Sequence, residues 1–101
     1  MAERAPTGDD RDDLVREIAE NLREHGAYVA DVDPRPNQRL VDLRWASLRA
    51  GRRLGLRTRM HVVSGASPRE PLVRITVVCV DAFGHVVEAS RAAVRAMVHR
   101  S

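Results

Sequence analysis

Two different spacings of apolar residues divide this chain into helices and strands. The first eleven residues follow neither spacing and are predicted to form a flexible polar leader, ahead of one domain over residues 12–101. We expect the domain to open with a helix that begins at Asp12 or Asp13, where a carboxylate suits the positive helix end, and that ends near His25. The apolar face of this helix is formed by Leu14, Ile18 and Leu22.

A short strand and a longer helix are predicted next. The strand covers Tyr28–Val32 and ends before two prolines, which cannot continue a central strand. The helix follows its N-cap Asn37 and ends at Gly55, which is expected to take a left-handed conformation. Apolar and polar residues also alternate over residues 39–45, so a strand is an alternative there. The helix is preferred for its length and its caps.

The second half of the chain predicts a hairpin and a third helix. Leu56–Ser64 alternates between apolar residues and basic residues, which is typical of a half-buried strand with a basic outer face. Leu72–Val80 is rich in β-branched residues, and the short loop before it predicts antiparallel pairing with the preceding strand. Asp81 is expected to cap a last helix whose apolar stripe begins at Phe83.

These elements predict one small α/β (α+β) domain with the order α-β-α-β-β-α. A β-α-β step of this size is a right-handed parallel crossover, and the hairpin adds an antiparallel strand. We therefore expect a three-stranded mixed sheet with its helices packed on one face. The uncovered face and the edge strands of such a sheet favour a homodimer.

Composition predicts a cellular location and shows that charge is distributed unevenly along the chain. The chain has a single cysteine and no apolar run of signal-peptide or membrane-spanning length, so we expect a cytoplasmic protein without membrane contact. All 17 basic residues are Arg. Residues 1–33 hold four Arg against ten acidic residues, a net charge of −6, whereas residues 34–101 hold 13 Arg against four acidic residues, a net charge of +9. This asymmetry predicts an anion-binding body beside an acidic segment.

Arginines on the second helix and on the strands after it are the candidate binding residues. Three of them share a helix face, two share a strand face, and one lies on the neighbouring strand. Guanidinium groups in such clusters can donate paired hydrogen bonds to phosphates. A solvated surface that reflects a GC-rich genome is the alternative. The predicted nucleic-acid-binding residues are Arg49, Arg52, Arg53, Arg57, Arg59 and Arg74.

No group of residues in the sequence predicts a catalytic site or a metal site. Trp45 and Tyr28 could stack on bases, but packing is the preferred role for both. Asp31 and Asp33 form a D-x-D pair, for which turn chemistry is preferred over Mg²⁺ binding. The histidines lack zinc-site spacing, and Cys79 is expected to be a buried, inert thiol. We therefore expect no enzyme, no metal, no cofactor and no small-molecule substrate.

The net positive charge of residues 34–101 predicts a small protein that binds the phosphate backbone of nucleic acid. Selectivity for sequence should be weak, because phosphate contacts carry no base information, and DNA and RNA both stay open as partners. The alternative is a non-enzymatic protein-interaction or dimerisation module that uses the open sheet face or an edge strand. This alternative accounts for the architecture equally well, but not for the basic body.

Overall fold

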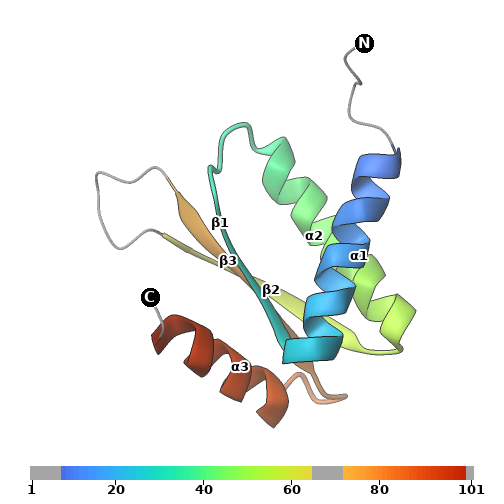
Figure 1. Cartoon of the computed structure of the whole chain (residues 1–101), viewed down its shortest axis with the longest axis vertical. Helices are drawn as coiled ribbons and strands as arrows, with labels where there is room; N and C mark the ends of the chain where they lie inside the picture. The colour runs from blue at the N-terminus through green and yellow to red at the C-terminus, as the bar shows by residue number, and fades with distance from the viewer. Residues whose placement is uncertain (1–7, 65–71, 100–101) are drawn as a thin grey trace.

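The computed structural model describes residues 8–64 and 72–99 of the chain, and there the predicted order α-β-α-β-β-α is confirmed (Figure 1). Helix α1 begins at Gly8 rather than at Asp12 or Asp13, so residues 8–11 of the expected leader are helical; the rest of that leader lies outside the described residues. Acidic residues favour the first turn of a helix, which explains the earlier start. The elements are α1 (Gly8–His25), β1 (Ala27–Val32), α2 (Gln38–Leu54), β2 (Arg57–Ser64), β3 (Val73–Val80) and α3 (Glu88–His99).

Helix α2 settles the choice over residues 39–45, because that segment is helical throughout. Asn37 occupies the N-cap position as predicted, although its side chain makes no capping hydrogen bond. Gly55 ends the helix in the left-handed conformation, with φ of 69°, and Leu56 N–H donates to the Gly51 carbonyl at 2.8 Å.

No helix in the described ranges has the length and apolar character needed to cross a membrane.

The three strands form a sheet in the order β1-β3-β2, and both pairings are antiparallel. The predicted hairpin of β2 and β3 is therefore confirmed. The predicted mixed pairing is corrected: β1 and β2 do run in the same direction, but β3 lies between them, so no parallel pair forms among the described strands. The crossover through α2 leaves one strand position open, and the returning arm of the hairpin fills it.

The first face of the sheet is covered by α1 and α2, and we call it the helical face. Its core includes Ile18 of α1 and the alternate residues Ile75 and Val77 of β3, all fully buried. Helix α2 lies close to β2 because its inner side is made of small residues. A Cβ atom at Gly51 would lie 2.8 Å from the Leu56 carbonyl oxygen and so could not be accommodated without movement.

Helix α3 lies against the opposite face of the sheet, which we call the second face (Figure 1). The expectation that helices pack on one face thus holds for α1 and α2 and is corrected for α3. The reason is that β3 is apolar on both sides: Val78 points away from the helical-face core and is only 3% exposed beneath Ala93 of α3. The Ser90 hydroxyl ties α3 to the sheet, since it donates to the Gly26 carbonyl at 2.6 Å and accepts the Cys79 N–H at 2.9 Å.

The start of the last helix is also corrected, from the residue after Asp81 to Glu88. The Asp81 carboxylate does not cap a helix, because its Oδ1 accepts the N–H groups of Phe83 at 2.8 Å and His85 at 3.0 Å within a turn. Gly84 completes this turn with φ of 84°, a conformation that side chains disfavour. Phe83 is therefore not part of a buried stripe and is 85% exposed.

Candidate nucleic-acid interface

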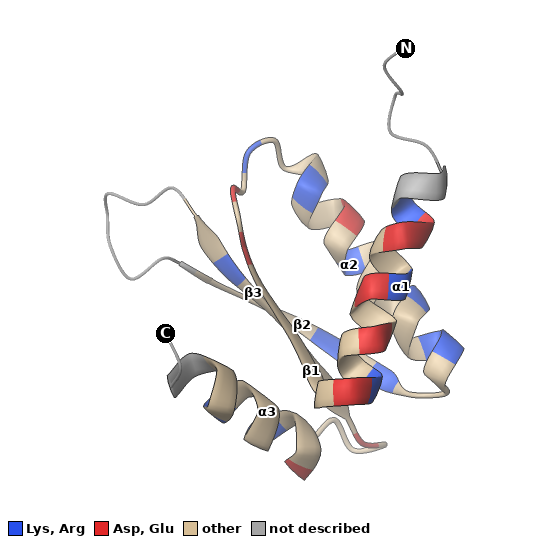
Figure 2. Cartoon of the chain, in the orientation of Figure 1, with Lys and Arg blue, Asp and Glu red and all other residues tan. Residues whose placement is uncertain are grey.

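The fold divides the six predicted arginines into two groups (Figure 2). Arg49, Arg52 and Arg53 are exposed on α2, the helix that covers the helical face. The other three lie on the second face. Arg57 pairs with Val80 and Arg59 with Val78, and both valines belong to the apolar cluster of that face. Strand alternation places Arg74 on the same side of β3 as these valines. The six residues thus do not form one continuous patch.

Arg74 is already engaged within the protein. Its Nε lies 3.0 Å from Asp31 Oδ1 and its Nη2 lies 3.4 Å from Asp31 Oδ2, across the pairing of β3 with β1. The hydrogen bond that Arg74 donates to Asp31, together with the negative charge of Asp31, raises the pKa of the Arg74 guanidinium. Asp31 is thereby neutralised by an arginine, and Asp33 instead accepts the Arg35 N–H at 2.9 Å in the turn after β1.

The two aromatic residues considered as base platforms both pack within the protein. Trp45 lies against the core, and the guanidinium carbons of Arg11 and Arg49 lie 5.6 Å and 5.2 Å from its ring centroid. Tyr28 is buried, and its hydroxyl donates to Glu17 Oε2 at 3.4 Å. Burial, followed by the negative charge of Glu17, raises the pKa of the Tyr28 hydroxyl to about 12.

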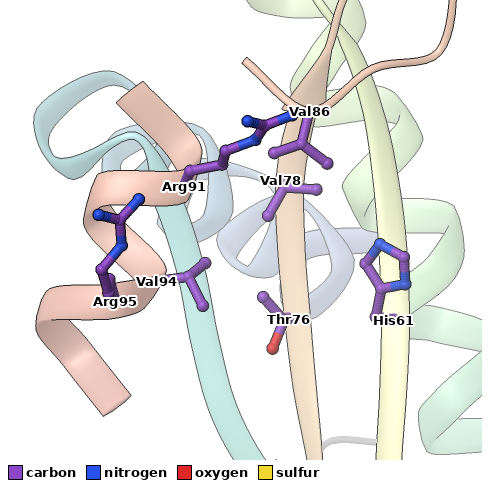
Figure 3. A pocket seen from close by; sticks show the side chains of 7 residues that line it. All are labelled: His61, Thr76, Val78, Val86, Arg91, Val94 and Arg95. Atoms are coloured by element: carbon purple, nitrogen blue, oxygen red, sulfur yellow. The ribbon is translucent and has the colours of Figure 1, made fainter. Parts of the chain in front are cut away.

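The second face contains a groove that sequence analysis missed (Figure 3). Arg91 and Arg95, one turn apart on α3, form one wall, and His61 of β2 lies on the other side. Its floor is largely apolar, with Val78 and Val94 at its centre. The groove is open to solvent and has a volume of about 570 Å³. The spacing of the two arginines was visible in the sequence, but only the placement of α3 shows which surface they border.

Four arginines of the second face, unlike Arg74, have no neighbouring carboxylate among the described residues. Within the described residues, no acidic side chain lies within 4.0 Å of the guanidinium nitrogens of Arg57, Arg59, Arg91 or Arg95. Asp81 is close in sequence, but its carboxylate is held by backbone N–H groups, chiefly that of His85, which lower its pKa. Most described acidic residues lie on α1, across the sheet from this surface (Figure 2).

We name this surface the basic second face and define it by Arg57, Arg59, His61, Arg91 and Arg95. Its chemistry is that of an anion-binding surface, because guanidinium groups donate hydrogen bonds and carry a fixed positive charge. The remaining reactive side chains do not gather: no set of three His, Cys, Asp or Glu residues with metal-binding geometry occurs in the described ranges, and Cys79 is buried in the core.

No family model, no curated protein and no solved structure matches the chain.

Proposed function

We propose that this protein binds nucleic acid through its basic second face, with contacts mainly to the phosphate backbone. The observation that carries the proposal is the gathering of four arginines, on β2 and α3, on the face of the sheet that holds the groove. Like the arginines of α2, they have no carboxylate partner among the described residues. Such groups gain more from an external polyanion than paired ones do, because no internal ion pair has to be broken. Nucleic acid is the abundant polyanion whose regular charges suit such a surface.

A salt-dependent titration tests the proposal. Fluorescently labelled DNA and RNA of about 20 nucleotides or base pairs should bind at about 50 mM salt and bind much more weakly at about 200 mM, since released counterions supply much of the affinity. Changing the base sequence at constant length should alter the affinity little. Absence of binding at the lower salt concentration would refute the proposal.

A pair of charge-matched variants makes the test specific to the surface. The double substitution Arg57→Ala and Arg59→Ala should weaken binding and flatten the dependence on salt, by about one unit of slope for each lost phosphate contact. Arg16→Ala with Arg23→Ala removes the same charge from α1 and should have much less effect, because α1 lies on the other side of the sheet. Equal losses in both variants would indicate attraction by net charge alone and would argue against a defined interface.

A second candidate function is self-association through β2. Within the described residues, β2 pairs with β3 alone, so its outer edge has no strand partner. Val62 and Val63, near the end of this strand, are 43% and 55% exposed. Pairing of two such edges would give a homodimer with a continuous sheet. Sedimentation velocity on the free protein tests this candidate; a monomer at concentrations of about 100 µM, high for specific dimers, would reject it.

A further inference from the structure

Phe83 is the most exposed large apolar side chain among the described residues. It is the only phenylalanine of the chain and lies in the turn that joins β3 to α3. With 85% of its surface exposed, its ring makes little contact with either apolar cluster. The ring therefore contributes little to packing and is open to an external partner.

The turn that carries Phe83 is held by several hydrogen bonds. The Asp81 carboxylate accepts two backbone N–H groups, and the Asp81 N–H in turn donates to the His85 carbonyl at 2.8 Å. Gly84 N–H donates to the Asp81 carbonyl at 3.0 Å. Beyond the turn, Val86 forms a bridge with Val80 of β3. The ring is thus presented from a fixed backbone, so little backbone entropy is lost when a ligand binds to it.

Basic and aromatic groups surround this turn. A Cβ atom at Gly84 would lie 3.2 Å from a terminal nitrogen of Arg59, so the guanidinium group of the basic second face reaches the residue next to Phe83. The His85 ring centroid lies 6.4 Å from that of Phe83, with the two planes inclined at 34°. Val86, three residues after Phe83, lines the groove that Arg91 borders (Figure 3). The turn therefore lies at one end of the basic second face.

We infer that Phe83 stacks on an unpaired nucleobase, so that the partner of the basic second face is single-stranded nucleic acid. The inference rests on the proposed function and deepens it, because arginines alone bind phosphates of single strands and duplexes alike. An aromatic ring next to a guanidinium is the pairing that single-strand binding surfaces use: the ring takes a base, and the cation takes the adjacent phosphate. A base inside a duplex has its faces covered by its neighbours and is not open to the ring.

The Arg59 cation beside the turn favours a nucleotide over an apolar peptide as the occupant. A hydrophobic protein partner would have to bury the neighbouring Arg59 cation without a carboxylate, which is unfavourable. A nucleotide supplies a flat ring and a negative charge in one unit. The ring can lie on Phe83 while its phosphate meets Arg59, so both features of the site are used by the same ligand.

The experiment compares three oligonucleotides of equal length: a single strand, the matching duplex, and a strand made of abasic sites that has phosphates but no bases. Affinity is measured for the unmodified protein and for Phe83→Ala, Phe83→Leu and Phe83→Trp. Phe83→Ala and Phe83→Leu should weaken binding of the single strand about tenfold, as loss of one stacked base does, and leave the salt slope unchanged. Phe83→Trp should bind at least as well as the unmodified protein. The duplex and the abasic strand should show no dependence on residue 83.

The matched control is Leu48→Ala, which removes another exposed apolar side chain, on α2, and should change none of the affinities. If all three oligonucleotides bind with a steep salt dependence but Phe83→Ala has no effect on the single strand, the stacking inference is wrong and the proposed function stands. If nothing binds at low salt, both are wrong. If Phe83→Ala instead changes the sedimentation coefficient of the free protein, Phe83 belongs to a contact between copies and the inference is overturned.

Discussion

The two faces of the sheet are built from the same strands but differ in how completely they are covered. On the helical face, α1 and α2, of 18 and 17 residues, bury most of the apolar side of β1 and β3 and cover β2 in part, since Val62 stays 43% exposed. On the second face, α3 has only 12 residues and covers Val78 and Ala27, whereas His61 and Val63 of β2 stay exposed. The helical face holds the main core, and the second face holds a small apolar cluster beside an open basic surface.

This difference separates stability from binding within one small domain. Fully buried apolar side chains contribute most to folding, because each is removed from water on folding. Exposed arginines without carboxylate partners contribute little to folding and remain available for a ligand. Substitutions on the helical face should therefore change stability, and substitutions on the open part of the second face should change binding.

The largest expected effect is at Ile75, which is fully buried on β3, the central strand of the sheet. Ile75→Ala should lower the free energy of unfolding by about 2–5 kcal/mol, because it leaves a cavity that the close-packed core cannot fill. Val63→Ala on β2 is the matched control: its side chain is exposed on the second face, so the change should stay within about 0.5 kcal/mol. Urea denaturation followed by circular dichroism measures both. Similar losses in the two variants would contradict the contrast between the faces.

Ser90→Ala should break the attachment of α3 without touching the helical face. The substitution removes the hydrogen bond to Gly26 and leaves the Cys79 N–H without its partner, at a cost of about 1–3 kcal/mol. Ser47→Ala is the control, because its buried hydroxyl bonds only within α2, to the Leu43 carbonyl at 2.7 Å, and should cost less. Hydrogen exchange should quicken in α3 more than in α1. Uniform quickening across all helices would show that α3 is not a separate layer.

Tyr28 predicts a pH dependence that belongs to the helical face alone. Its pKa is raised from 10.0 to about 12, so the folded state holds this proton more tightly than the unfolded state does. The resulting stability is fully present below pH 10 and is lost as the pH rises through about 12, by at most about 3 kcal/mol. Denaturation curves recorded across this range should show the loss. Tyr28→Phe should remove this part of the dependence; a variant that loses stability as before would place the titrating group elsewhere.

The smallest expected change in stability comes from the α3 side of the groove. Arg91→Ala with Arg95→Ala should alter the free energy of unfolding by no more than about 0.5 kcal/mol, because both side chains are exposed. The same variant should weaken nucleic-acid binding and reduce its salt slope. Arg52→Ala with Arg53→Ala on α2 removes equal charge from the other group of arginines. If the α2 variant loses more affinity than the α3 variant, the interface lies on the helical side instead.

The sequence was sufficient for the elements that depend on local patterns. The alternation along β2 correctly assigned its basic and apolar sides, and Gly55 correctly marked the end of α2. The predicted start of α3 was wrong, because an aspartate before a helical pattern can either cap a helix or close a turn. Only the hydrogen bonds that Asp81 accepts from the Phe83 and His85 N–H groups distinguish the two.

The parts that depend on long-range contacts could not be obtained in this way. The pairing of Arg74 with Asp31 joins residues 43 positions apart and follows from the order of strands, which the sequence leaves open. Placing α3 on the second face also needed the structure, although one signal was present. The run Val77 to Val80 is apolar at every position, which is typical of a strand buried on both sides. A strand that is buried on both sides requires a helix on each face of the sheet.

The ion pair of Asp31 and Arg74 has a consequence for how the chain selects its strand alignment. A shift of β1 by one residue would turn Tyr28 and Val32 away from the helical face and bring Asp31 toward the core. An unpaired carboxylate there is strongly disfavoured, so the misaligned sheet is rejected during folding. Exchanging the two charges, with Asp31→Arg and Arg74→Asp, should keep the native alignment, whereas a pair of like charges would weaken the distinction between the native alignment and its neighbours.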